Sequence, residues 1–209
     1  MQRPTWLTAQ RLRPSWGSAS NNIWAVGHLT LIHWDGTSWT PQPNVTESLE
    51  AVWGTDATHV WTVDAGGPHL GTGVVRRWNG TKWTQVHTTS RPLVAISGSS
   101  NDDIWALQGD AFIDGSVSHW DGATWSETKL SVRGELKGIW AAHPDDVWIV
   151  GRPQMMGQGE ATVLHWDGST WSSVSSGTTN GLYGIWGTGR SDVWTAGGGA
   201  TVLHLTCLP

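Results

Sequence analysis

The sequence predicts an all-β fold built from five copies of one short unit, and three observations support this prediction. Tryptophan accounts for 18 of the 209 residues, whereas phenylalanine and tyrosine occur once each. One tryptophan of the unit recurs at positions 24, 61, 105, 148 and 194, with spacings of 37, 44, 43 and 46 residues. No segment shows the periodicity of an amphipathic helix. The tryptophan content therefore comes from a repeated unit.

Each copy contains four segments with strand character, which are clearest in the fourth copy. They are Leu136–Trp140, Asp146–Gly151, Val163–Trp166 and a segment that begins at Trp171. Short alternating segments bounded by Gly, Asn, Asp and Ser are typical of strands. Four such strands in a repeat of about 40 to 50 residues are typical of a β-propeller blade.

The turn between the third and fourth strands carries the strongest local signal. An Asp-Gly or Asn-Gly pair lies between two apolar residues in each copy that has a fourth strand. The pairs are Asp35-Gly36, Asn79-Gly80, Asp121-Gly122 and Asp167-Gly168. We expect a short hairpin in which both residues of the pair take positive φ.

The two ends of the chain complement each other. The fifth copy stops after its third strand, and Pro4–Thr8 resembles a fourth strand. We therefore predict a five-bladed β-propeller of four-stranded antiparallel blades, closed by the N-terminal strand, which removes the open edge of the last blade. The prediction is a single domain, 1–209, with repeats at about 9–45, 46–89, 90–131, 132–177 and 178–209 plus 1–8. The alternative is an open fragment completed by other chains.

The repeated residues resemble several propeller families. Trp-Asp at the end of the third strand is similar to the WD repeat, and a second strand that ends in Gly is similar to the kelch repeat. The Asp-Gly-x-x-Trp turn is similar to the Asp-box of sialidase-type propellers. The full unit resembles the Trp-rich propeller repeats of uncharacterised bacterial proteins. Five Trp-rich blades also resemble tachylectin-type lectins, and this resemblance implies binding of N-acetylated sugars.

Composition limits the classes of partner. Charged residues make up 14% of the chain and the net charge is -5, so nucleic acid is not an expected partner. No apolar run is long enough for a membrane span. Cys207 is the single cysteine, which excludes an intrachain disulfide. We expect a monomer. No signal peptide is visible, so the chain as written is expected to be cytoplasmic, or extracellular if a leader was removed.

Residues that recur at the same strand position in several blades are interpreted as structural. The tryptophans are expected to pack between blades. The third-strand histidines (His33, His119, His165 and His204) cannot converge on one ion, so we expect a hydrogen bond to a neighbouring strand, with no metal and no cofactor. The second-strand acids (Asp103, Asp146 and Asp192) are expected to bond to nearby backbone in the turn.

Binding residues are expected where the repeat breaks. One set is the second position of strand one, near the channel mouth, with a solvated rim of charge pairs as the alternative. Its members are Arg13, Glu50, Val94, Lys137 and Tyr183. The other set is the long loop between strands two and three, with ordinary surface loop as the alternative. Its members are His69, Asp110, Phe112, Asp114, Arg152, Gln154, Met155 and Met156.

Three functions follow from this reading. The leading hypothesis is a non-enzymatic binding module for glycans, because lectin-like sites combine an aromatic face with a few fixed polar groups. The second is a protein-interaction platform formed by the long loops of blades two to four. The third is a small-molecule enzyme at the channel mouth that uses Glu50, Lys137 and Tyr183. No nucleophile elbow, metal triad or phosphate loop is present in the sequence, and no catalytic residue is assigned.

Overall fold

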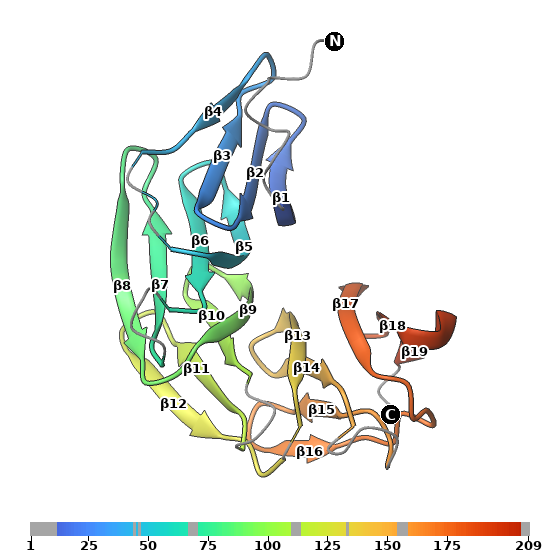
Figure 1. Ribbon diagram of the computed structural model, residues 1–209. Coiled ribbons are helices and arrows are strands. Elements are labelled where there is room, and N and C mark those ends of the chain that lie inside the picture. The colour runs from blue at the N-terminus through green and yellow to red at the C-terminus, as the bar shows by residue number, and fades with distance from the viewer. Residues whose placement is uncertain are drawn as a thin grey trace. The chain divides into compact units, whose positions relative to one another are not determined.

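The computed structural model describes residues 12–43, 45, 47–66, 71–109, 114–132, 134–153 and 159–205. Strands dominate these residues, together with a short 3-10 turn, η2 (Gly198–Ala200). The strands form five sheets, here called blades one to five in chain order, and within each sheet every strand pairs antiparallel with the next strand in sequence (Figure 1). No helix in the described residues is long and apolar enough to cross a membrane.

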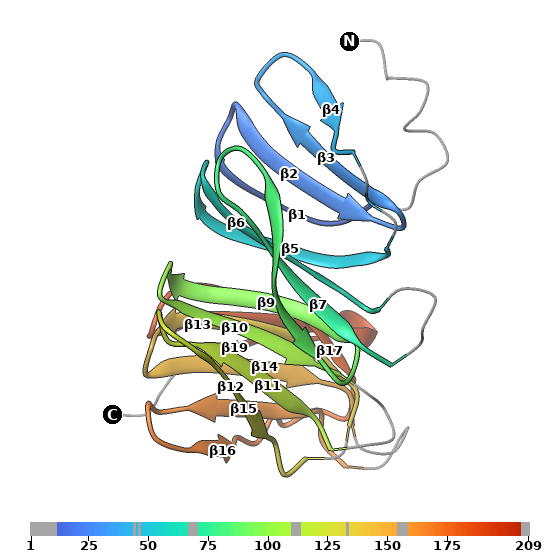
Figure 2. The ribbon, with the colours of Figure 1, turned by 90° about the vertical axis from the view of Figure 1, so that its left-hand side faces the viewer.

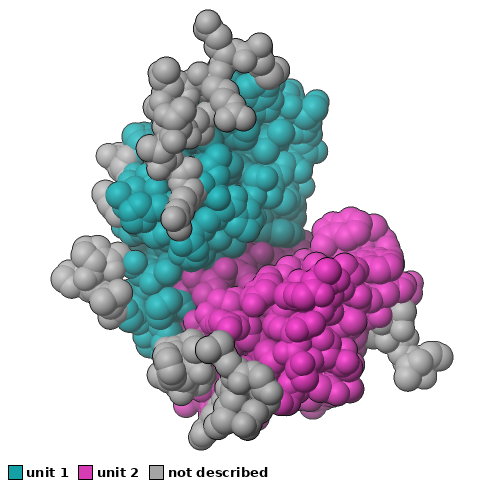
Figure 3. All heavy atoms as spheres, turned by 45° about the vertical axis from the view of Figure 1, so that its right-hand side comes forward, with its two compact units in different colours: residues 1–92 teal, residues 93–209 magenta. Residues whose placement is uncertain are grey.

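The chain divides into two compact units, unit 1 (residues 1–92) and unit 2 (residues 93–209), which are coloured separately in Figure 3. Unit 1 contains blades one and two. Blade one consists of β1 (Leu12–Ala19), β2 (Asn22–Gly27), β3 (Thr30–Trp34) and β4 (Trp39–Pro41). Blade two consists of β5 (Leu49–Asp56), β6 (His59–Asp64), β7 (Gly73–Trp78) and β8 (Trp83–Thr89).

Unit 2 contains blades three to five, and Figure 2 shows the strands of blade three side by side. Blade three consists of β9 (Leu93–Ser100), β10 (Asp103–Gln108), β11 (Ser116–Trp120) and β12 (Trp125–Lys129). Blade four consists of β13 (Leu136–His143), β14 (Asp146–Gly151), β15 (Val163–Trp166) and β16 (Trp171–Ser173). The described strands of blade five are β17 (Leu182–Gly189), β18 (Asp192–Gly197) and β19 (Val202–Leu205).

The predicted strand content is confirmed: the chain is all-β, and four of its blades have four antiparallel strands. Blade five has three strands within the described residues. The predicted closing strand, Pro4–Thr8, lies outside the described residues. Closure of the last blade and a single domain over 1–209 therefore stay predictions.

The core of each unit lies between consecutive blades. In unit 1, Trp24 of β2 is 1% exposed and packs with Leu49 and Val52 of β5. Close approach at this interface requires glycine, because a Cβ at Gly54 would lie 2.9 Å from the ring of Trp16. The repeat tryptophans thus stabilise each unit by burying indole surface against the next blade.

Blade five departs from this pattern of burial. The second-strand tryptophans of the first four blades are 1–2% exposed, whereas Trp194 is 40% exposed and Trp186 is 61% exposed. In blade four the equivalent face is covered by β17, where a Cβ at Gly187 would lie 2.8 Å from Trp140. Packing is therefore confirmed for the buried tryptophans, and for Trp186 and Trp194 it stays a prediction.

The Asp-Gly turns form hairpins as predicted, but their expected geometry is wrong. Trp34 pairs with Trp39, so four residues form the loop, and of the Asp-Gly pair only Gly36 has positive φ, at 97°. The Oδ1 atom of Asp35 accepts the backbone N–H groups of Thr37 and Ser38, each at 2.8 Å. Hydrogen bonds from Ser38 and Thr37 hold the pKa of Asp35 well below its ordinary value. The aspartate therefore acts as the acceptor that closes a longer loop.

Candidate functional site

The clearest candidate site in unit 1 is a groove of about 450 Å³ between blades one and two, here called the blade-two groove. The polar, charged and aromatic residues that line it include Gln42, Glu47, Arg76, Trp78, Trp83 and Gln85. The first two lie in the segment around the end of β4 and the start of β5. The other four lie on β7 and β8, the outer strands of blade two.

The charged residues of this groove break the repeat. Two positions before the third-strand tryptophan, the five blades carry Ile32, Arg76, Ser118, Leu164 and Leu203. At the last residue of strand two they carry Gly27, Asp64, Gln108, Gly151 and Gly197. Blade two alone has an ion pair at these positions. Comparison of the copies at these two positions would reveal this pair, but binding residues were predicted only in strand one and in the long loops.

Arg76 is fixed between two carboxylates. Asp64 is fully buried, and its Oδ2 atom accepts a hydrogen bond from Nη1 of Arg76. The Oδ1 atom of Asp64 accepts the backbone N–H groups of Gly66 at 3.0 Å and Val74 at 3.1 Å. On the other side, Nη2 of Arg76 lies 3.2 Å from Oε1 of Glu47, and both side chains are partly exposed. The guanidinium is thus held in one orientation at the wall of the groove.

Two indoles form the aromatic wall. Trp78 and Trp83 pair across the hairpin with ring centroids 5.6 Å apart. The buried Trp24 of blade one meets Trp83 edge to face at 5.2 Å and Trp78 at 5.3 Å. Packing therefore fixes both rings, so that a ligand meets a surface that is already ordered.

A β-bulge shapes the outer wall. The register between β7 and β8 shifts between Val75 and Arg76, so that Val75 pairs with His87 and Arg76 with Gln85. The outer hairpins of blades one, three and four have no such shift. A bulge re-aims the side chains next to it. In blade two this irregularity lies at the arginine that distinguishes the groove.

The charged strand-one candidates, Arg13, Glu50 and Lys137, occur in ion pairs. In unit 1, Arg13 forms an ion pair with Glu50. In unit 2, Lys137 pairs with Glu135, and Arg152 Nη1 lies 3.1 Å from the same carboxylate. Lys137, and then Arg152, lower the pKa of Glu135 and keep it ionised. That all five strand-one residues meet at one channel mouth stays a prediction.

The other sequence candidates divide into described and undescribed residues. Tyr183 is 49% exposed. The side chains of Tyr183 and Arg152 both border Gly181, so the structure brings one strand-one candidate and one loop candidate together. Six candidates of the long loops lie outside the described residues: His69, Asp110, Phe112, Gln154, Met155 and Met156.

The recurring histidines bond to the neighbouring strand, as predicted. Nε2 of His119 on β11 lies 2.7 Å from Oδ1 of Asp103 on β10, and its ring stacks on Trp105 at 3.7 Å. The expected role of Asp103 is wrong, because Oδ1 also accepts the indole N–H of Trp105 at 2.9 Å and no backbone bond is made to it in the described residues. The same indole bond forms at Asp146 and Asp192. These acids therefore hold the core histidine and tryptophan together.

Comparison with known proteins identifies the fold. No protein-family model matches the chain, and no curated protein matches it. Among solved structures, YCF48 from Cyanidioschyzon merolae is 15% identical with a TM-score of 0.67, covering 99% of this chain and 69% of that chain. YCF48 bound to D1 peptide is 15% identical with a TM-score of 0.56, covering 96% and 79%. The Aleuria aurantia lectin N224Q mutant in complex with Fucα1-6GlcNAc is 14% identical with a TM-score of 0.61, covering 93% and 74%.

At this level of identity the similarity is one of fold. A structure of the Aleuria aurantia lectin is described as a six-bladed β-propeller, and it is 14% identical to this chain with a TM-score of 0.60. The blades of this chain are therefore β-propeller blades, as the repeat predicted. The structural neighbours include fucose-binding lectins and a peptide-bound protein.

Proposed function

We propose that the chain is a non-enzymatic binding module that takes a neutral sugar in the blade-two groove. The observation that carries the proposal is the fixed pair of Arg76 and Glu47, 3.2 Å apart, in the same groove as the ordered indoles of Trp78 and Trp83. A sugar hydroxyl both donates and accepts hydrogen bonds. It can donate to the Glu47 carboxylate while it accepts from the Arg76 guanidinium, and the apolar face of the sugar can stack on an indole.

The charge of the groove favours a neutral ligand. Arg76 and Lys82 contribute two positive charges to the lining, and Glu47 together with the buried Asp64 behind Arg76 contributes two negative charges. The charges cancel, so neither an anion nor a cation gains from the net field. Directed hydrogen bonds to charged groups, each worth about 1.5–3 kcal/mol, would supply the specificity instead.

The structural neighbours support a binding role. The Aleuria aurantia lectin and the SapL1 lectin are propellers in complex with fucosides, and YCF48 is bound to a peptide. A carbohydrate ligand fits the charge-neutral groove with its aromatic wall. A protein-interaction platform on the long loops is the second candidate, and it comes from the sequence.

A glycan array followed by calorimetry tests the proposal. We expect the intact chain to bind one class of neutral sugar. The Glu47→Gln variant should weaken binding about tenfold or more, because the hydrogen bond to a charged acceptor is lost. Glu127→Gln on exposed β12 is the matched charge-removing control and should leave binding unchanged. Absence of sugar binding at millimolar concentration, or equal binding by the Glu47→Gln variant, would contradict the proposal.

A further inference from the structure

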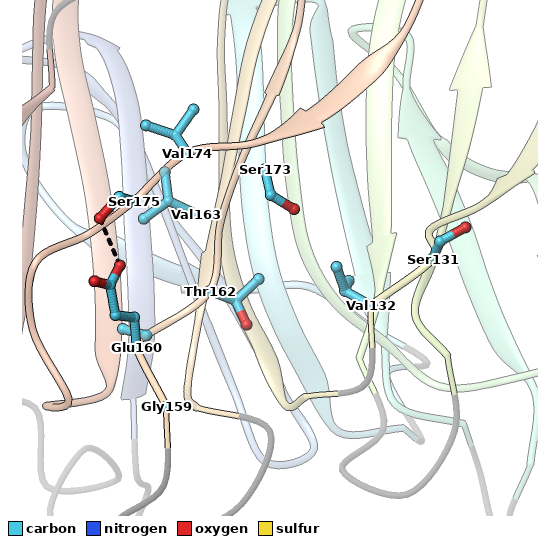
Figure 4. A pocket seen from close by; sticks show the side chains of 10 residues that line it. Ser131, Val132, Gly159, Glu160, Thr162, Val163, Ser173, Val174 and Ser175 are labelled. Carbon is cyan, nitrogen blue, oxygen red and sulfur yellow. Dashed lines mark hydrogen bonds between the residues drawn. The ribbon is translucent and has the colours of Figure 1, made fainter.

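A second groove lies between blades three and four of unit 2, here called the blade-four groove, and it consists of two hollows. The first has a volume of about 430 Å³ and the second about 350 Å³. Ser131, Val132 and Ser173 line both hollows, so the two are continuous. In the first hollow, Figure 4 shows Glu160 and Ser175 at one end and Ser131 and Val132 at the other. This groove is therefore long enough for an extended ligand.

The blade-four groove is not a copy of the blade-two groove. Where blade two has Glu47, Asp64 and Arg76, the equivalent positions of blade four carry Gly134, Gly151 and Leu164. The fixed guanidinium is absent from these positions, and Leu164, which lines the second hollow, is 3% exposed. The two grooves must therefore differ in what they bind.

The carboxylate of Glu160 lies at one end of the first hollow and is held by hydrogen bonds. The Oε2 atom of Glu160 accepts three hydrogen bonds, from Ser175 Oγ at 2.7 Å and from the backbone N–H groups of Ser176 at 2.9 Å and Gly177 at 3.2 Å. Within the described residues, all three of these hydrogen bonds go to Oε2 and none goes to Oε1. One oxygen therefore orients the carboxylate, and the other is placed to accept donors from a ligand.

The second hollow carries the aromatic element. Trp166 and Trp171 line it, with ring centroids 5.6 Å apart. The buried Trp105 of blade three meets Trp171 edge to face at 5.8 Å, so that the ring is held by packing. Ser169 and Thr170 at the hairpin add hydroxyl groups. Hydroxyls and apolar surface continue into the first hollow through Ser131, Val132 and Ser173.

We propose that the blade-four groove binds an extended neutral oligosaccharide, with one sugar stacked near Trp171 and a further sugar donating hydroxyl groups to Glu160. This inference rests on the proposed carbohydrate function and extends it to a second kind of site. The blade-two groove takes a single sugar, whereas the two joined hollows take a chain. Binding at the blade-four groove therefore depends on the length of the ligand.

The test uses two probe series, β-1,4-linked glucose and β-1,4-linked N-acetylglucosamine, each from one to six units. Calorimetry is performed on the full chain carrying Asp64→Asn and Arg76→Leu, which removes the charged pair from the blade-two groove. We expect affinity for one series to rise about tenfold or more between one and three units. Glu160→Gln should abolish this rise, because an amide NH₂ replaces the open acceptor oxygen. Trp171→Phe should weaken it, and Glu127→Gln should not change it.

The outcomes separate the two sites. A monosaccharide bound by the unmodified chain and lost in the Asp64→Asn/Arg76→Leu variant supports the blade-two site alone. A length-dependent affinity that survives in that variant and needs Glu160 supports the blade-four site, even if the monosaccharide fails to bind. Affinity that does not depend on length, no binding by either series, or capture of an extended peptide in place of both sugars would overturn the inference.

Discussion

Replacing Arg76 with leucine should destabilise the protein mainly through the carboxylate that is left behind. Asp64 is fully buried, and Arg76 is the partner that balances its charge. Removing one partner of a buried pair costs about 3–5 kcal/mol. The Arg76 side chain is 22% exposed, and leucine fills part of its volume, so we expect the lower end of this range, about 3 kcal/mol.

The double variant Asp64→Asn/Arg76→Leu isolates this effect. An asparagine oxygen can still accept the N–H groups of Gly66 and Val74, which Asp64 binds at 3.0 Å and 3.1 Å. No charge is then left at this buried site. Because replacing both members of a buried pair is often close to neutral, the double variant should lose only about 1 kcal/mol. It should therefore be more stable than the single variant by about 2 kcal/mol.

Urea unfolding followed by tryptophan fluorescence measures these free energies, with Glu127→Gln as the control that should not shift the midpoint. A buried-charge origin of the cost would be refuted if Arg76→Leu lost less than about 1 kcal/mol. It would also be refuted if the double variant were as unstable as the single one, because the cost would then come from lost packing and not from a buried charge.

Three further predictions concern the scaffold. Asp103→Ala should lower the free energy of unfolding, measured by urea titration, by about 3 kcal/mol, because Trp105 and His119 both lose a charged acceptor. A change below about 1 kcal/mol would show that these two hydrogen bonds are dispensable. Gly122→Ala should cost about 1–2 kcal/mol, since its φ is +92° and a Cβ would lie 2.9 Å from that of Asp102, and an unchanged thermal midpoint would contradict this. Burial raises the pKa of Asp103, but the hydrogen bonds from His119 and Ser99 outweigh burial, so the pKa is lowered. The stability that ionised Asp103 contributes is therefore complete above its unfolded pKa near 3.8 and is lost as pH falls through the lower folded value. Burial lowers the pKa of His33 despite the charge of Asp35, so stability also falls as pH drops below about 6.5. Urea midpoints that stay constant from pH 8 to pH 3 would contradict the predicted loss of stability from both residues.

The repeat made most of the fold predictable. The spacing of the tryptophans and the Asp-Gly pairs located the blades, because strands and hairpins depend on residues close together in the chain. The turn geometry was missed for a local reason: the Asp35 carboxylate can bond forward to Thr37 and Ser38, which favours a four-residue loop over a two-residue one.

The blade-two groove could not be predicted in the same way. Glu47, Asp64 and Arg76 belong to three different segments, and they meet only because the strands of blade two pair with one another. The charged residues in strand one attracted attention because they break the repeat, but Arg13 and Glu50 pair with each other. A departure from a repeat thus shows where the scaffold requirement is relaxed. Arg76 differs from Arg13 in its surroundings, because a buried carboxylate holds it and two indoles line the same groove.

Sugar binding by the unmodified chain and by its Glu47→Gln variant is the most direct test of the proposed function. Calorimetry with the best sugar from a glycan array should show binding by the unmodified chain and a loss of affinity of about tenfold or more in the variant, with Glu127→Gln unchanged. Equal affinity in all three proteins would show that the sugar binds outside the blade-two groove. No sugar binding at millimolar concentration would contradict the carbohydrate function itself.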